Sequence, residues 1–396
     1  QRCSALRILL LQEDCYDEAL SMIKGAMREI GFGDPKYLDV DCGPVINLAA
    51  QIKLQNYIDN VRQNNQIIDE LDSQPKNGYF VSPTLIRIES MDDIKDEFFG
   101  PILHVLSYKN DDLEKTIDQL NSKGFGLTFG IHSRIEHKVQ DILSKVNAGN
   151  IYINRNQIGA VVGSQPFGGE GLSGTGPKAG GPNTLLGFSQ NLLCSEKSDH
   201  KIIFSDESFV HKQLFSPTLQ LSDELLSFMK RELLILEEEF FELLNQEVLK
   251  YSSEISLPGP SGESNGLRYK PKGTVICLGP EPDDLLKQTV LSLFLGNSVI
   301  SQISTEEHDF LISLGFEKDN IHRINGSRGL SLFASKSYNA VFYFGNSISL
   351  QEVILSSRSE LIPIITSIHE AWELVKEQVI TEDTTASGGN ANLLAL

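Results

Sequence analysis

The first 190 residues alternate short apolar runs with stretches of helical periodicity. Residues 5–11 form a run typical of a buried strand, and residues 14–30 then place apolar side chains three to four positions apart. Further strands are predicted at 102–108, 127–132 and 149–154, and helices at 113–121 and 137–146. This alternation favours an α/β domain built on a parallel sheet.

A glycine-rich run at 159–182 ends this first domain, which we predict to span residues 1–190. So many glycines exclude a helix or a regular strand, and they indicate an ordered loop whose backbone approaches another group closely. Residues 191–256 are predicted to form a connector with one amphipathic helix, because Leu225, Met229, Leu233, Leu236, Phe240 and Leu244 recur at helical spacing.

The segment LPGPSGESN (257–265) indicates a boundary to a second, smaller Rossmann-like α/β domain at 257–396. Its predicted strands lie at 274–279, 298–300 and 340–344, and its predicted helices near 283–295, 306–314, 350–356 and 370–378. The first strand–helix turn lacks GxGxxG and carries acids, so we expect a covering role there and no dinucleotide.

Composition narrows the classes of function. The formal net charge of −19 disfavours binding to nucleic acid or to an anionic membrane surface. No apolar run reaches the roughly 20 residues that span a bilayer, and the N-terminus has no signal-peptide pattern. Five scattered cysteines without CxxC, and eight histidines without HExxH, predict neither a disulfide framework nor a metal site.

Cys3 is the candidate nucleophile. It precedes the first predicted strand beside Arg2, and a neighbouring cation together with free backbone N–H groups favours the reactive thiolate. On local sequence alone, a small buried cysteine is the commoner explanation, and Cys15, Cys42, Cys194 and Cys277 keep that interpretation. His104 and His132 are most simply core or surface residues.

The segments around Cys3 occur in a specific order: QRCSALR (1–7), GDP…DCGPVI (33–46), YFVSPTLI (79–86), DEFFGPILHV (96–105), NAGNIYINR (147–155) and IGAVVGSQPFGGEGLSGTGPKAGGP (158–182). This series resembles the aldehyde dehydrogenase superfamily from its nucleophile to the end of its catalytic domain. Residues 161–182 are most similar to the Δ1-pyrroline-5-carboxylate dehydrogenase half of the proline utilization A family. The segment 257–265 and the C-terminal 385–394 resemble the C-terminal region of the long members of that family. The resemblance is dense over 1–190, thin over 195–256 and moderate over 257–396.

The resemblance implies roles for seven residues. Cys3 would attack the aldehyde of L-glutamate γ-semialdehyde, and NAD would accept the hydride before water releases glutamate. Glu97 would bond the nicotinamide-side ribose, and Phe99 would contact the nicotinamide or, alternatively, serve as a core aromatic. Gly159 and Ala160 would hold the α-carboxylate of the substrate through backbone N–H groups, Ser4 would supply a hydroxyl, and Phe167 would pack on the aliphatic chain.

The same family places its NAD-binding domain, a general-base glutamate and an oxyanion-hole asparagine before the nucleophile, and an FAD-dependent proline dehydrogenase barrel before those. We therefore expect the printed chain to be a fragment of a bifunctional, homo-oligomeric bacterial cytoplasmic enzyme and to be inactive alone, with the upstream domains as partners. Peripheral association of the parent protein with the inner membrane is left open, and the C-terminal tail is expected to cover the active site. Two alternatives remain open: a non-catalytic scaffold, and a thiol hydrolase that pairs Cys3 with a histidine.

Overall fold

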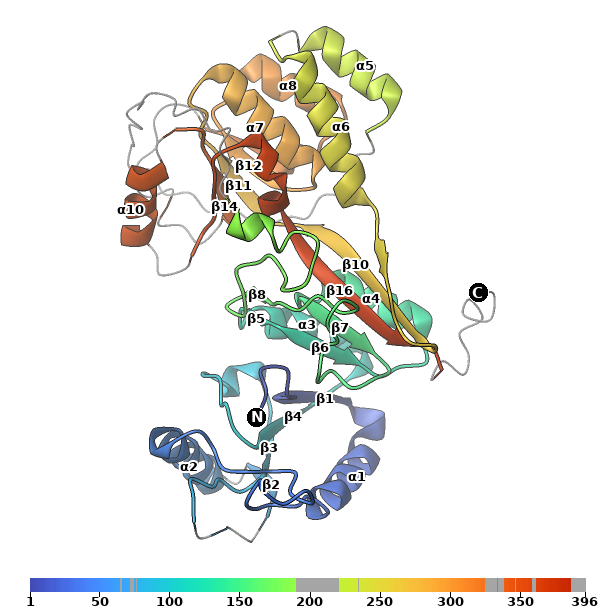
Figure 1. The fold of residues 1–396 in the computed structure, drawn as a ribbon, viewed down its shortest axis with the longest axis vertical. Helices are drawn as coiled ribbons and strands as arrows, with labels where there is room; N and C mark the ends of the chain where they lie inside the picture. The colour runs from blue at the N-terminus through green and yellow to red at the C-terminus, as the bar shows by residue number, and fades with distance from the viewer. Residues whose placement is uncertain are drawn as a thin grey trace.

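The computed structural model describes residues 1–64, 66–71, 75, 77–189, 221–233, 235–324, 333, 338–345, 347–357 and 361–385. Its elements group around three sheets stacked along the long axis of the molecule (Figure 1). The N-terminal sheet lies at the bottom of that view, and the C-terminal parallel sheet at the top. Strands from both ends of the sequence form the sheet between them.

The N-terminal sheet holds, in spatial order, β1 (Ile8–Gln12), β4 (Ile102–Tyr108), β3 (Thr84–Ile88) and β2 (Ile67–Glu70). β1, β4 and β3 are parallel, and β2 is antiparallel to β3. Successive residues of a strand point to opposite faces. Leu85 accordingly packs in the cluster of α1 (Tyr16–Arg28), and Ile86 in that of α2 (Leu48–Gln63).

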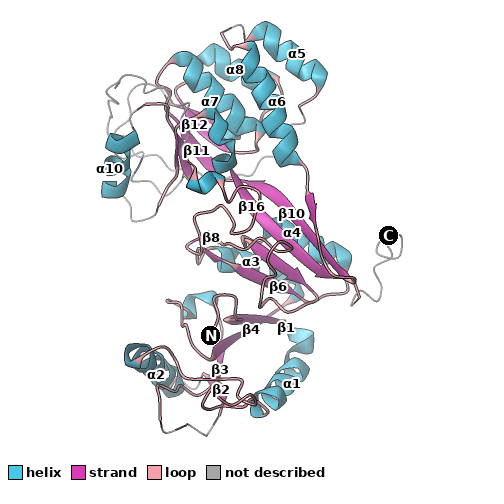
Figure 2. Ribbon diagram, in the orientation of Figure 1, coloured by secondary structure: helices cyan, strands magenta, loops and turns pink. Residues whose placement is uncertain are grey.

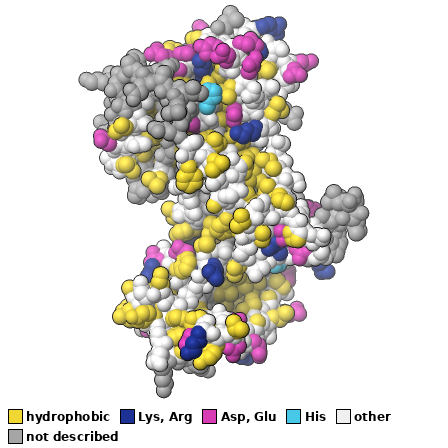
Figure 3. All heavy atoms as spheres, in the orientation of Figure 1, with side chains coloured by type: hydrophobic (Ala, Val, Ile, Leu, Met, Phe, Trp, Pro, Cys, Tyr) yellow, Lys and Arg dark blue, Asp and Glu magenta, His cyan; other side chains and the backbone are white. Residues whose placement is uncertain are grey.

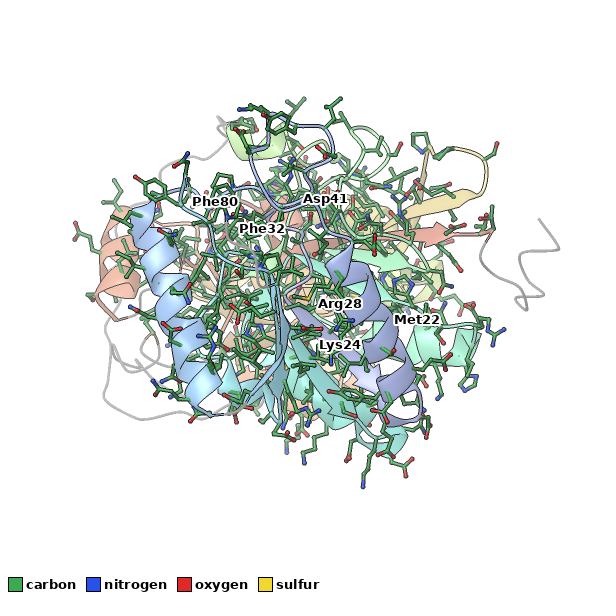
Figure 4. The ribbon with its side chains drawn as sticks, turned by 90° about the horizontal axis from the view of Figure 1, so that it is seen from below. Met22, Lys24, Arg28, Phe32, Asp41 and Phe80 are labelled. Atoms are coloured by element: carbon green, nitrogen blue, oxygen red, sulfur yellow. The ribbon has the colours of Figure 1, made fainter. Side chains whose placement is uncertain are left out.

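The segment after α1 is fixed to this sheet domain by an aromatic pair. The rings of Phe32 and Phe80 meet edge to face with their centroids 5.4 Å apart, and Figure 4 shows them side by side. The Asp41 carboxylate accepts a hydrogen bond from Gly31 N at 2.9 Å. These contacts fold the connection between α1 and α2 against the domain.

The middle sheet combines both ends of the chain, in the order β6 (Thr128–Ile131), β7 (Asn150–Ile153), β16 (Val375–Asp383), β10 (Glu263–Pro271) and β9 (Ile255–Leu257). β16 is parallel to β7 and antiparallel to β10. α3 (Leu113–Asn121) and α4 (Glu136–Lys145) pack with β6 and β7, and β5 (Phe125–Gly126) pairs with β8 (Glu170–Gly171). β16, from the C-terminal region of the chain, is therefore an internal strand of the middle sheet, between β7 and β10.

The C-terminal sheet is parallel and has the order β13 (Ile321–Arg323), β12 (Ser298–Ser301), β11 (Thr274–Cys277), β14 (Ala340–Phe342) and β15 (Ile364–Ile365). Its helices are α5 (Asp223–Glu232), α6 (Glu238–Ser252), α7 (Pro282–Phe294), α8 (Thr305–Ser313) and α10 (Ser347–Ser357), drawn in cyan in Figure 2. Short 3₁₀ segments occur at Glu13–Cys15, Met91–Asp93, Asn110–Asp112, Leu186–Phe188, Lys318–Asn320 and Ile368–Leu374.

The predicted α/β class is confirmed, and two predicted helices are corrected. The helix expected at 370–378 is wrong from Val375 onward, because Val375–Asp383 is β16 and pairs with β10 along nine residues. The single helix expected through 225–244 is two helices, broken between Glu232 and Glu238. Met229, Leu233, Leu236, Phe240 and Leu244 are all buried in one core cluster, so both helices turn their apolar faces to the same core.

The structure adds detail to two further expectations. The strand expected at 5–11 forms as β1, but its residues are only half-buried because β1 is an edge strand. The predicted domain boundary at 257–265 connects β9 to β10, which are neighbours in one sheet. Most of the tail expected to cover the active site lies outside the described residues, which end at 385. No helix in the described part of the chain is long and apolar enough to cross a bilayer.

Candidate active site

Cys3 lies in an exposed turn immediately before β1. Two hydrogen bonds to the Arg2 carbonyl close this turn, from Ala5 N at 3.1 Å and from Arg7 Nη2 at 3.0 Å. The exposure of Cys3 argues against the interpretation as a buried structural cysteine. In the part of the chain that the structure describes, no hydrogen bond joins the Cys3 sulfur to a histidine, although His104 and His132 border the same cavity.

Glu97 and Phe99 approach the same turn from the segment before β4. The Arg7 guanidinium lies over the Phe99 ring, 4.5 Å from its centroid. Burial lowers the pKa of Arg7, while its attraction to Glu97 and Cys3 opposes that shift. The structure therefore brings Cys3, Glu97 and Phe99 together, with Arg7 among them.

These residues line one cavity of about 840 Å³ between the N-terminal and middle sheets. The edge strands β1 and β6 contribute opposite apolar walls, and Cys3, Arg7, Glu97, Phe99 and Gln157 border the space. Figure 3 shows apolar side chains gathered around the hollow between these two parts of the molecule. A concave, largely apolar space with a few polar groups at its border is typical of a ligand-binding pocket.

The loop of residues 156–164, called loop 156–164 below, follows β7 and is tied to the Cys3 turn. Gln157 Nε2 donates to the Ser4 carbonyl at 3.1 Å. Gly159 has a φ of 83°, in the left-handed region that favours glycine. In the described part of the chain, the backbone N–H groups of Gly159 and Ala160 donate to no other group. Adjacent free N–H groups of this kind can bind an anion.

Ser4 and Phe167 complete the set of predicted site residues. Ser4 is buried, and its described contact is through its carbonyl. Phe167 is half-buried, and its backbone forms an antiparallel bridge with Ala179. None of the four predicted substrate-binding residues, Ser4, Gly159, Ala160 and Phe167, borders the cavity that Cys3 lines, so their substrate contacts stay predictions.

The remaining cysteines and His104 show no catalytic arrangement in the described structure. His104 is buried, with Nδ1 donating to the Arg7 carbonyl at 3.1 Å and Nε2 at 2.9 Å from the Tyr57 hydroxyl, so it is a satisfied core residue. Burial raises the pKa of Cys277 to about 12. Cys15 is exposed rather than buried, Cys42 is half-buried, and Cys194 lies outside the described residues. No group of three or more potential metal ligands occurs among the residues described.

Comparison with known proteins identifies this part of the chain. Residues 1–191 match the profile described as "Aldehyde dehydrogenase family". They form an aldehyde dehydrogenase domain. The chain is 36% identical over 368 residues to the "Bifunctional protein PutA" of Klebsiella aerogenes, which covers 89% of this chain and 27% of that protein. It is 33% identical over 198 residues to the "1-pyrroline-5-carboxylate dehydrogenase" of Bacillus mycoides, which covers 50% of this chain and 38% of that protein.

The likeness extends beyond the aldehyde dehydrogenase domain in fold. The structure of Proline Utilization A from Corynebacterium freiburgense superposes with a TM-score of 0.63 over 97% of this chain and 36% of that chain, at 21% identity, which shows similarity of fold alone. The chain spans about a third or less of the length of the bifunctional relatives it matches over most of its residues.

Three residues around the candidate site are not predicted from the sequence: Arg7, Gln157 and Glu263. Arg7 stands in the opening motif four positions after Cys3, so the motif itself could have drawn attention to it. Gln157 directly precedes the predicted substrate loop. Glu263 contacts Arg155 from 108 positions away in sequence, and no local pattern marks it.

Proposed function

We propose that this chain carries the nucleophile and the substrate loop of an NAD-dependent L-glutamate γ-semialdehyde dehydrogenase acting in proline catabolism within a bifunctional enzyme. One observation carries the proposal: Cys3, from the opening motif, and Glu97 and Phe99, from the motif at 96–105, border one cavity next to a loop with free backbone N–H groups. The relatives named 1-pyrroline-5-carboxylate dehydrogenase support this choice of substrate.

Cys3 acts as the nucleophile in this reaction. Its thiolate attacks the aldehyde carbon, so a carbon–sulfur bond forms and the carbonyl oxygen becomes an oxyanion. The Cys3 backbone N–H is the oxyanion donor that this chain offers. The chemistry that NAD would supply here is acceptance of the hydride from the former aldehyde carbon, and Glu97 and Phe99 would hold it. Water then attacks the resulting thioester of Cys3, which releases the carboxylate product and frees the thiol.

The residues present fit a nicotinamide cofactor. The Glu97 carboxylate is exposed at the cavity and can accept hydrogen bonds from ribose hydroxyls. The Phe99 ring is 46% exposed there, with Arg7 on one of its faces, and it offers a free aromatic surface. Glu97 and Phe99 would hold the cofactor beside Cys3, which orients the reacting carbon.

The free N–H groups of Gly159 and Ala160 bind the α-carboxylate of the substrate in this proposal. Backbone donors carry no charge of their own, so they bind the acid without a buried lysine. Their connection to the Cys3 turn through Gln157 and Ser4 fixes the distance between the carboxylate site and the nucleophile. A dicarboxylic-acid semialdehyde of defined length is then preferred over simple aldehydes.

The test is Cys3→Ala in the natural polypeptide that contains these residues, with NADH formation from L-glutamate γ-semialdehyde followed by absorbance. We expect the rate to fall at least about 10³-fold, because the covalent path is lost. Cys42→Ala, at a half-buried cysteine that does not border this cavity, is the matched control and should retain the rate. Undiminished turnover by Cys3→Ala would refute the assignment.

A further inference from the structure

We propose that Glu263, on β10, is a positioning residue for loop 156–164 and thereby for substrate binding; this inference rests on the proposed function. The Glu263 carboxylate lies between the two ends of that loop. Its Oε2 forms an ion pair with Arg155 Nη1, directly before the loop. Its Oε1 accepts from Gln165 Nε2 at 3.0 Å, directly after the loop.

Apart from the bond of Gln157 Nε2 to the Ser4 carbonyl, few described hydrogen bonds hold the loop between these two ends. Val162 at its tip is 95% exposed, and Val161 is about half-exposed. Its internal hydrogen bonds are few: Ile158 N to Asn156 Oδ1 at 3.0 Å, and Ser164 N and Gln165 N to the Val161 carbonyl at 3.3 and 2.9 Å. The conformation of Gly159 and Ala160 therefore depends on how the ends are held.

The charge of Glu263 also sets the orientation of the Gln165 amide. A carboxylate only accepts hydrogen bonds, so it must face the Gln165 NH₂ group. This leaves Gln165 Oε1 to accept from Val161 N, at 3.2 Å, inside the loop. An uncharged amide at 263 could donate as well as accept, and it would then allow Gln165 to turn over and release Val161.

Glu263 is itself fixed by the sheet of the C-terminal region. Asn265 Nδ2 donates to Glu263 Oε1 at 2.9 Å, and Asn265 Oδ1 accepts from Thr381 Oγ1 at 2.8 Å. Thr381 is on β16, which pairs with β7, and β7 ends two positions before Arg155. The side chains of Glu263 and Arg155 are only 15% and 19% exposed, so the pair is largely removed from solvent.

These contacts assign a function to the β10–β16 pair: it sets the position of the two N–H groups that bind the substrate carboxylate. The cofactor side of the site is built differently, because Glu97 and Phe99 precede β4 and have no described contact with β10. Loss of Glu263 should therefore weaken the binding of the semialdehyde and leave the binding of NAD unchanged.

The experiment compares Glu263→Gln with the parent natural polypeptide by steady-state kinetics for both substrates. We expect KM for the semialdehyde to rise about 5- to 20-fold, as the loss of a charge-assisted contact predicts, with kcat within about threefold. KM for NAD should stay within about twofold. Glu254→Gln, at an exposed carboxylate beside Gly266 of β10, is the matched control and should behave as the parent.

A second variant, Gln165→Met, tests the same path without removing the ion pair and should give the same selective rise in the semialdehyde KM. Thermal unfolding of each variant shows whether it is folded. Equal changes in both KM values, or a fall in kcat alone, would mean that Glu263 only stabilises the fold and would overturn the inference. If the parent itself does not oxidise the semialdehyde, the proposed function fails, whereas an active parent with an unaffected Glu263→Gln variant refutes this inference alone.

Discussion

Lys178 offers a direct test of the packing beneath the glycine-rich segment. Its side chain is buried at 3% exposure, and Nζ donates to Asn150 Oδ1 at 3.1 Å and to the Gly168 carbonyl. Burial lowers the pKa of Lys178 from 10.5 to about 8, although Glu170 and Glu377 act in the opposite direction. Replacement by methionine removes the titrating group and keeps much of the buried volume.

The lowered pKa predicts the sign and size of a pH effect on stability. Between pH 8 and 10.5 the unfolded chain holds the Lys178 proton more tightly than the folded chain, so this group makes unfolding less favourable as pH rises. At pH 7 the shift corresponds to a penalty of about 3 kcal/mol in the folded state, and at pH 10 to under about 1 kcal/mol. From pH 7 to pH 10 the free energy of unfolding of the parent should thus rise by about 2–3 kcal/mol relative to that of Lys178→Met.

The assay is urea unfolding of both proteins at several pH values from 7 to 10, followed by the fluorescence of Trp372. This residue is the single tryptophan of the chain and lies just before β16, where Glu377 accepts a hydrogen bond from Lys178 N at 2.7 Å. Lys115→Met measures the effect of removing an exposed lysine. Titrating groups that do not interact with Lys178 cancel in the difference between parent and variant, whereas Glu377, whose pKa is raised by burial and in part lowered again by Lys178, does not. If the difference in unfolding free energy between the two proteins stays constant from pH 7 to 10, the lowered pKa of the buried Lys178 is refuted.

Two other changes test the site and the core. Glu97→Gln should raise KM for NAD about 10-fold and leave KM for the semialdehyde unchanged, because a charge-assisted bond to the ribose is weakened. Steady-state kinetics of the natural polypeptide measure both KM values. An unchanged KM for NAD would show that Glu97 is not part of the cofactor site. Phe240→Ala should lower the free energy of unfolding by about 3–5 kcal/mol, since this ring is 1% exposed and packs edge to face on Phe241. A loss below about 1 kcal/mol in urea unfolding would contradict that packing.

Helices and strands are predicted correctly where the spacing of the apolar residues fits only a helix or only a strand. The strand expected at 102–108 and the helix at 113–121 form with those bounds. The error at 370–378 has a physical cause. Val375 and Val379 are four positions apart, which suits a helical face, but residues an even number apart also share one face of a strand. Val375–Asp383 forms a strand because it pairs with β10 and β7, both of which are distant in sequence.

The candidate site likewise combines residues that local sequence reveals with residues that only long-range contacts bring together. Cys3, Glu97 and Phe99 each stand in a short motif, and a short motif can be recognised from neighbouring residues alone. Gln157 contacts the Ser4 carbonyl from 153 positions away, and Glu263 lies 98 positions from Gln165. Contacts of that length depend on sheet order, and the insertion of β16 between β7 and β10 is not visible in the sequence.

The two sides of the site therefore respond to different parts of the chain. The cofactor side depends on the Cys3 turn and the segment before β4, which pack within the N-terminal sheet domain. The substrate side depends on loop 156–164, whose ends are held through Glu263 on β10. Because β16 is an internal strand between β7 and β10, changes that loosen β16 must displace Glu263 relative to Arg155. Such changes in the C-terminal region should alter recognition of the aldehyde substrate before they alter binding of the cofactor.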